Sequence, residues 1–304
     1  MSFSKEVKDE LFMQVSPARH CMIAELSAML AACARLTTEE DGSLLVRIHA
    51  ERKEAADKCC LLLEKLFGWK EGRLCRTGNL VEIVRTEDAE RLLNTAKLKP
   101  EEEAVETGLA ADNLIVQNTC CKRAFIRGTF LCTGSVNDPE KAYHFEIVLP
   151  DEARARQMQN IINSFSIDAK VILRKRYYVV YVKEGAQIVD LLNIMEAHRA
   201  LMQFENVRIL KEVRNSVNRQ VNCEAANINK TVTAASRQID DIIFIRDKVG
   251  FDKLSEGLEE IARLRIEYPE ATLKELGAML NPPIGKSGVN HRLRKLGEIA
   301  EGYR

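Results

Sequence analysis

The 304-residue chain lacks several features that define common protein classes. It has a single Trp among only 6% aromatic residues, and its 45 Lys and Arg are balanced by 45 Asp and Glu. A formal net charge of zero excludes a uniformly basic protein but still allows basic faces. No apolar run approaches the roughly 20 residues that a membrane helix needs, and charged residues interrupt the stretch after Met1, which argues against a secretory signal. We therefore expect a cytoplasmic protein with no membrane partner.

Metal-binding and disulfide signatures are also missing from the linear sequence. The nine cysteines include adjacent pairs at 59–60 and 120–121, but there is no CxxC pair. The five histidines are scattered, with no spacing typical of metal ligands. Such a pattern supports neither a zinc site nor a disulfide framework. We expect buried, reduced thiols in a cytosolic protein, and neither a metal nor a cofactor.

What the chain does contain is an internal repeat with an offset of one hundred residues. The segment Cys21–Leu36 aligns without a gap with Cys121–Val136, which places Ala28 over Gly128. The elements expected after these two helices follow the same order in each half. They are strands at 44–49 and 144–149, helices at 53–67 and 152–165, strand pairs at 72–76 with 80–85 and at 169–175 with 177–183, and closing helices at 88–96 and 186–197. The pattern predicts an α+β domain made of two repeats, at about 20–98 and 120–198.

Small residues in the first helix of each repeat have a physical reason. Side chains no larger than Ala or Gly let two helix backbones approach closely along a central pseudo-twofold axis. The stretch Ala124–Val136 resembles the LAGLIDADG helix of homing endonucleases, in which an Asp or Glu just before the last glycine holds the metal that cleaves DNA. Here that position is Thr133, and its counterpart in the first repeat is Cys33. Because neither residue is a carboxylate ligand for a hard divalent cation, we expect no catalytic site.

Between the repeats, residues 99–112 carry a cluster of Glu residues and are predicted to be a solvated connector. The second repeat has a moderate basic excess, with 17 Lys and Arg against 12 Asp and Glu over residues 119–230. Homing endonucleases lay such strands along DNA, so four cations are candidate phosphate contacts: Arg174, Lys175, Arg176 and Lys183. A solvated strand face explains the same cations equally well.

The last part of the chain differs from the two repeats in its composition and in its predicted elements, which are all helices. The asparagine-rich residues 213–236 are predicted to form a hinge or junction, followed by helices at 240–249 and 254–267. Thr272 and Glu275 form a T-x-x-E capping box that starts a short helix at 273–280. After a turn, Ser287 is expected to cap a final helix at 288–300, whose inner stripe is Val289, Leu293, Leu296 and Ala300.

A short helix, a turn and a basic helix are typical of a helix-turn-helix module, whose second helix enters the major groove of DNA. The expected DNA-binding residues lie on or beside the outer face of this last helix: Ser287, Asn290, His291, Arg292, Arg294 and Lys295. Arg can contact guanine and Asn can contact adenine. The alternative is a small helical bundle whose basic residues are merely solvated.

A degenerate duplicated LAGLIDADG domain followed by helix-turn-helix resembles the WhiA family over essentially the full length. The most specific segments are Val221–Ile239, VNCEAANINKTVTAASRQI, and Leu273–Leu296, LKELGAMLNPPIGKSGVNHRLRKL. The resemblance implies an α+β LAGLIDADG-like domain at 1–219, a polar junction and linker helix at 220–250, and an all-α helix-turn-helix domain at 251–304.

Family membership further implies a bacterial, sequence-specific DNA-binding regulator of cell division, chromosome segregation or sporulation, without nuclease activity. Its expected partner is double-stranded DNA in the nucleoid, with other transcription regulators or RNA polymerase as further candidates. Two alternatives stay open. One is a structural, nucleoid-associated DNA binder, and the other is an active homing-type endonuclease, for which Glu25 and Asp41 are the nearest carboxylates in sequence.

Overall fold

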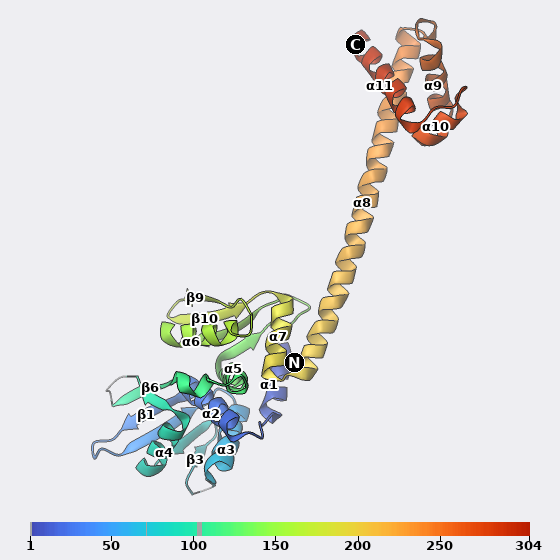
Figure 1. Ribbon diagram of the computed structural model, residues 1–304. Helices are drawn as coiled ribbons and strands as arrows, with labels where there is room; N and C mark the ends of the chain where they lie inside the picture. The colour runs from blue at the N-terminus through green and yellow to red at the C-terminus, as the bar shows by residue number, and fades with distance from the viewer. Residues whose placement is uncertain (1, 71, 102–104) are drawn as a thin grey trace. The chain divides into compact units, whose positions relative to one another are not determined.

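The computed structural model describes residues 2–70, 72–101 and 105–304. It divides the chain into two compact units, Met1–Lys211 and Glu212–Arg304, referred to below as unit 1 and unit 2. Unit 1 combines helices and sheets, whereas unit 2 is helical (Figure 1). Within the described part of the chain, none of the helices combines the length and apolarity required to cross a bilayer.

Unit 1 is built around two helices that lie side by side, α2 (Arg19–Cys33) and α5 (Thr119–Thr133) (Figure 1). Each is followed by its own antiparallel sheet. The first sheet has the order β3 (Cys75–Thr77), β4 (Leu80–Ile83), β2 (Leu44–His49), β1 (Ala34–Thr38), β6 (Glu106–Ala111) and β5 (Leu98–Pro100). The second has the order β7 (Gly134–Val136), β8 (Phe145–Leu149), β10 (Tyr177–Val182) and β9 (Lys170–Arg174). The helices of the two repeats also correspond: α3 (Lys53–Phe67) and α4 (Thr86–Ala96) in the first, α6 (Glu152–Asn163) and α7 (Gly185–Met195) in the second. The predicted duplicated α+β architecture is confirmed.

The contact between α2 and α5 depends on the small residues that the repeat brings together. A Cβ built on Gly128 would lie 2.5 Å from the backbone oxygen of Glu25 and 3.0 Å from the Cβ of Ala28. Real Cβ atoms do not approach a backbone oxygen so closely, so only glycine allows this helix spacing. The predicted Ala28–Gly128 contact is confirmed.

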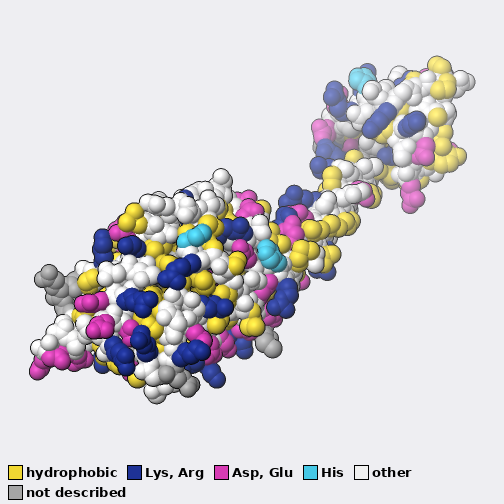
Figure 2. All heavy atoms as spheres, turned by 60° about the horizontal axis from the view of Figure 1, so that its bottom comes forward, with side chains coloured by type: hydrophobic (Ala, Val, Ile, Leu, Met, Phe, Trp, Pro, Cys, Tyr) yellow, Lys and Arg dark blue, Asp and Glu magenta, His cyan; other side chains and the backbone are white. Residues whose placement is uncertain are grey.

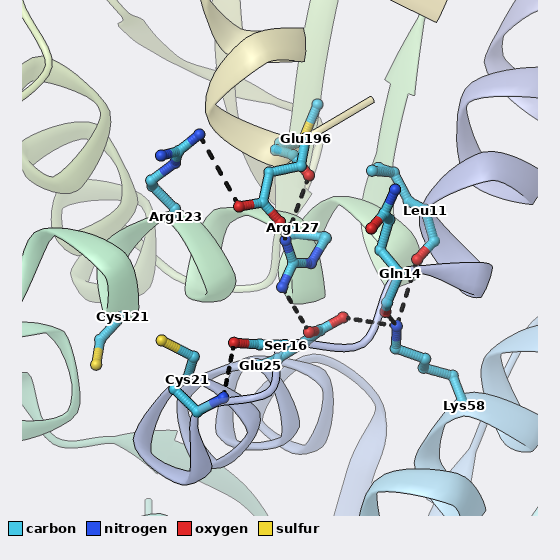
Figure 3. A network of polar contacts seen from close by, with 12 residues as sticks. Leu11, Gln14, Ser16, Cys21, Glu25, Lys58, Cys121, Arg123, Arg127 and Glu196 are labelled. Atoms are coloured by element: carbon cyan, nitrogen blue, oxygen red, sulfur yellow. Dashed lines mark hydrogen bonds and ion pairs between the residues drawn. The ribbon is translucent and has the colours of Figure 1, made fainter. Parts of the chain in front are cut away.

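A buried ionic network crosses the same helix pair (Figure 3). The Glu25 carboxylate lies 2.9 Å from Nη2 of Arg127 and 3.2 Å from Nζ of Lys58, and all three side chains are at most 2% exposed. Arg127 also reaches Oε2 of Glu196 at 2.7 Å, just after α7. Lys58 further donates to the backbone carbonyl of Gln14. The network therefore ties α2, α3, α5 and the end of α7 together, because each buried charge needs its partners.

The N-terminal stretch, for which the sequence carried no structural prediction, is a helix, α1 (Phe3–Met13), which packs Val7 and Leu11 into the core.

One expectation from sequence is wrong in unit 1. The segment expected to be a solvated connector instead adds strands β5 and β6 to the first sheet, except for residues 102–104, which lie outside the described residues. Leu98, just before this segment, and Leu109 within it are buried, so apolar side chains of both strands face the core.

Residues 213–236 are a continuous helix and not the predicted hinge. They belong to α8 (His198–Lys248), a helix of 51 residues that contains neither Pro nor Gly. Its first N–H groups are satisfied by Glu10 of α1, whose carboxylate accepts from the backbone N–H of Arg199 (2.8 Å) and Ala200 (3.0 Å). A side-chain acceptor at this position is the interaction that helix N-termini require.

Unit 2 packs three helices against the C-terminal end of α8: α9 (Glu256–Glu267), α10 (Leu273–Met279) and α11 (Lys286–Tyr303) (Figure 1). Ile242 and Ile245 of α8 are fully buried in this core, beside Ile261 of α9 and Leu276 of α10. The end of α8 is thus a structural member of the helix-turn-helix unit.

Candidate nucleic-acid interface

Helix α10 begins with a complete capping box. The Thr272 hydroxyl accepts a hydrogen bond from the backbone N–H of Glu275 (3.3 Å), and the Glu275 carboxylate accepts one from the backbone N–H of Thr272 (2.7 Å). The backbone hydrogen bond from Thr272 holds the pKa of Glu275 below its ordinary value. The predicted box is confirmed, and it fixes the start of the first helix of the pair.

The turn between α10 and α11 approaches α10 very closely. The backbone N–H of Ile284 donates to the carbonyl of Gly277 (2.9 Å). A Cβ on Gly277 would lie 2.2 Å from the Ile284 oxygen, and the nearby Leu280 is buried. The glycine therefore permits the tight connection that sets α11 against α10.

Helix α11 buries the apolar stripe expected from the sequence: Val289, Leu293, Leu296 and Ala300. Its start differs from the prediction. The N-cap residue is Gly285, so Ser287 lies within the first turn and does not cap the helix. The predicted capping role of Ser287 is wrong, although its side chain is exposed on the first turn.

The side chains of the outer face of α11 form the candidate base-reading surface. Asn290, His291, Arg294 and Lys295 are all exposed. Arg294 approaches Glu298 at 3.2 Å, but both side chains are more than half exposed. An exposed pair four residues apart contributes little stability, so the guanidinium can exchange this partner for another acceptor.

Arg292, expected on or beside the outer face of α11, is directed toward α9. It is half-buried, and its Nη1 donates to the backbone carbonyl of Gly257 in α9 (3.1 Å). Its guanidinium lies within 3.3 Å of the position a Cβ on Gly257 would take. Arg292 thus ties α11 to α9 inside the unit, a role that linear spacing did not reveal.

A groove of about 530 Å³ lies beside the first turn of α11. Its lining includes Lys230 of α8, Lys274 of α10, and Lys286 and Asn290 of α11. None of the three lysines makes an ion pair with a residue that the structure describes. The sequence analysis did not predict Lys274 or Lys286 as DNA-binding residues. Their positions on either side of the turn between the two helices could have indicated such a role. Figure 2 shows Lys and Arg side chains on the visible face of unit 2, with Asp and Glu side chains among them, as on unit 1.

The sheet of the second repeat offers fewer available cations than its sequence suggests. Both terminal nitrogens of Arg174 contact the Glu146 carboxylate, at 3.0 and 3.1 Å. Although burial raises the pKa of Glu146, the hydrogen bonds from Arg174 and His144 bring it below its usual value. Arg174 is therefore largely neutralised on the sheet by a charged acceptor.

The other three cations of this sheet lie at or near the ends of its strands. Arg176 stands over the ring of Tyr177 at 5.0 Å, and Lys183 over that of Tyr181 at 5.3 Å. Lys175 occupies the turn between β9 and β10 with a φ of 60°. These three side chains are exposed and suit contact with phosphates better than contact with base edges.

Cys33 and Thr133 lie at the C-terminal ends of α2 and α5, as the repeat predicts. The Cys33 thiol donates to the carbonyl of Met29 (2.9 Å), and the Thr133 hydroxyl to that of Thr129 (3.3 Å). The hydrogen bond with Cys132 lowers the pKa of Cys33. The neighbouring Cys59 and burial outweigh this effect and raise that pKa well above its ordinary value. A protonated thiol and a hydroxyl cannot replace the carboxylates that hold a hard metal ion.

The space beside these two residues is a pocket of about 420 Å³ that is lined by Glu51 and Glu106 among others. Among the described residues, no group of three potential metal ligands includes either glutamate. Glu25 and Asp41, the carboxylates considered for an active endonuclease, do not line the pocket. Glu25 is engaged by Lys58 and Arg127, and the carboxylate of Asp41 accepts from the backbone N–H of Ser43.

Comparison with known proteins identifies both parts of the chain. The family model of the WhiA C-terminal HTH domain matches residues 217–300, and that of the WhiA LAGLIDADG-like domain matches residues 122–214. The chain is 59% identical, over the full length of both sequences, to a probable cell division protein WhiA of Lachnoclostridium phytofermentans. It is 46% identical to one of Alkaliphilus oremlandii, over 99% of this chain and 97% of the relative.

A solved structure has the same fold. The crystal structure of full-length DUF199/WhiA from Thermatoga maritima matches with a TM-score of 0.56 at 23% identity, over 99% of this chain and 98% of that one.

Proposed function

Because the chain belongs to the WhiA family, we propose that it is a sequence-specific DNA-binding regulator that does not cleave DNA. The observation that carries the proposal is the set of exposed polar side chains on α11, Asn290, Arg294 and Lys295. Asn290 also lines the groove that contains the three lysines. Amide and guanidinium groups on one helix face can read base edges, while lysines contact phosphates. Relatives are named cell division proteins, so we place the action of this regulator in cell division, chromosome segregation or sporulation.

The same proposal covers the role of each part of the chain and the place in the cell where the protein acts. It assigns DNA reading to residues 251–304 and makes residues 1–219 a platform whose Lys175, Arg176 and Lys183 supply at most backbone affinity. Arg174 is not included among these phosphate contacts, because its guanidinium is paired with the Glu146 carboxylate. The protein would act in the cytoplasm on nucleoid DNA, with RNA polymerase or other regulators as candidate partners.

The proposal is tested by comparing base and phosphate contacts on α11. A preferred duplex is first selected from a random pool with the full-length protein, and affinities are then measured by fluorescence anisotropy at several salt concentrations. Arg294→Ala should lose roughly 1–3 kcal/mol on the preferred duplex and relax discrimination at one base position. Lys286→Ala should weaken preferred and scrambled duplexes alike and reduce the salt slope by about 1.

Arg292→Ala is the matched control for Arg294→Ala on the same helix. Since Arg292 is engaged with Gly257, its loss should lower the melting temperature of unit 2 and leave base preference unchanged in the folded fraction. If Arg294→Ala, Asn290→Ala and Lys295→Ala all bind the preferred duplex as the parent does, α11 is not the reading helix.

A structural, nucleoid-associated DNA binder shares the features of unit 2. The two functions are distinguished by mapping chromosomal binding sites by immunoprecipitation and comparing transcripts after deletion. Discrete sites next to genes whose transcripts change would support the regulator. Uniform occupancy without transcript changes would support the structural binder.

A further inference from the structure

Four potential metal ligands meet at the end of the central helix pair opposite Cys33 and Thr133. His20 and Cys21 are the second and third residues of α2, and Cys120 and Cys121 are the second and third residues of α5. Their ligand atoms all lie within 4.8 Å of one another. Figure 3 shows the thiols of Cys21 and Cys121 facing each other across the two helices. The one-hundred-residue offset of the repeat thus places two adjacent pairs of ligands at equivalent positions.

The distances fit a tetrahedral ion. Nδ1 of His20 lies 3.2 Å from Sγ of Cys121, 3.4 Å from Sγ of Cys21 and 3.9 Å from Sγ of Cys120. A tetrahedral zinc with Zn–S of about 2.3 Å and Zn–N of about 2.0–2.1 Å separates a nitrogen from a sulfur by about 3.6 Å. The observed distances bracket that value, so an ion would require only small side-chain movements.

The burial of the four side chains argues against simple core packing. Cys21 and Cys121 are buried beside Ala24 and Ala124, as small apolar residues would be. His20 and Cys120 are exposed, and an exposed imidazole directed at three thiols adds nothing to a hydrophobic core. All nine cysteines are free, so no disulfide accounts for the cluster.

We propose that His20, Cys21, Cys120 and Cys121 bind one Zn²⁺ and that this ion braces the two repeats of unit 1. Three thiolates and one imidazole are soft and borderline donors that select Zn²⁺ over Mg²⁺ or Ca²⁺. Four protein ligands complete the tetrahedron, so the site is structural and leaves no position for a catalytic water. The four residues lie in the first turns of α2 and α5, and the partial positive charge of a helix N-terminus offsets the net negative charge of a Cys₃His zinc centre.

The linear sequence hid this site because its ligands come from two segments one hundred residues apart and contain no CxxC pair. We expected no metal because the sequence has no CxxC pair. The fold brings the four ligands together without such a pair, so that argument does not apply here. The position of the ion is also distinct from the degenerate cleavage position, where Cys33 and Thr133 lie at the other ends of the same helices.

The experiment measures zinc in the full-length protein by mass spectrometry of the metal, and then binding of Zn²⁺ and Co²⁺ to protein stripped with a chelator. We expect one zinc per chain, a Kd below about 10 nM, and the visible absorption bands of tetrahedral thiolate-bound cobalt. Cys120→Ser and His20→Ala alter exposed side chains that the core does not need. Each should weaken Zn²⁺ affinity by more than about 100-fold, since loss of a supporting residue alone costs up to that factor.

Cys75→Ser and Cys223→Ser are matched controls, because both cysteines are exposed and lie outside the cluster. They should retain one zinc per chain. Folded parent protein that binds zinc more weakly than about 1 µM, or full retention of zinc by Cys120→Ser and His20→Ala, would overturn the site. So would an intact mass that shows a disulfide between these cysteines in place of bound metal. A melting temperature of the parent that chelation leaves unchanged would overturn the bracing role.

Discussion

At the scale of single residues, Glu25 is a buried charge whose partners are themselves buried. It is fully buried and faces two buried cations, Lys58 and Arg127. Glu25→Gln keeps the shape of the side chain and removes its charge, which leaves both cations without a buried counter-charge. Breaking a buried pair in this way costs about 3–5 kcal/mol, and urea unfolding of the full chain measures that loss in the transition of unit 1.

Glu196→Gln is the matched control for this prediction. Glu196 contacts the same Arg127, but its side chain is 38% exposed. An accessible carboxylate is replaced by water at little cost, so we expect a loss of about 1 kcal/mol or less. Equal losses for the two variants would show that Glu25 is not the centre of the network.

At the scale of elements, the contact between α2 and α5 sets the arrangement of the duplicated unit. Gly128→Leu places a side chain where even a Cβ would lie 2.5 Å from the backbone of α2. The helices must separate, at a cost of about 1–3 kcal/mol or more for overpacking. Thermal melting of the full chain should show a lower transition for unit 1, with that of unit 2 unchanged.

Gly302→Ala controls for the general effect of replacing a helical glycine. Gly302 lies in α11 with nothing within 4 Å of its Cβ position. Because Ala favours helix over Gly by roughly 1 kcal/mol, this variant should be neutral or slightly stabilised. A melting curve of Gly128→Leu that coincides with the parent's would contradict the close packing of α2 against α5.

At the scale of the whole molecule, we expect a protein that binds DNA and leaves it uncut. The positions that would carry the metal-binding carboxylates hold Cys33 and Thr133, each hydrogen-bonded within its own helix. Metal-assisted hydrolysis requires ligands that hold and orient the cation. Supercoiled plasmid incubated with the purified protein and Mg²⁺ or Mn²⁺ should therefore stay supercoiled. Metal-dependent nicking by the parent that disappears in Glu51→Gln or Glu106→Gln would show that the neighbouring pocket had taken over the chemistry.

The sequence by itself determined the features that arise from local or periodic signals. The repeat predicted two copies of helix, strands and helix, and the strand at 44–49 and the helix at 53–67 were placed at their observed bounds. The capping box at Thr272 and the apolar stripe of α11 were also correct. Capping and helical periodicity involve residues within a few positions of one another, so they are visible in one dimension.

Only the tertiary structure decided the features that depend on distant partners. The asparagine-rich segment resembled a junction because Asn favours turns, yet without Pro or Gly it continues as α8 from an N-terminus satisfied by Glu10. The acidic segment became β5 and β6 because β1 offers a free edge. Arg292 turned inward toward Gly257. The cluster of His20 with three cysteines arises because two helices start side by side, and such a meeting of segments one hundred residues apart is a property of packing that no local spacing encodes.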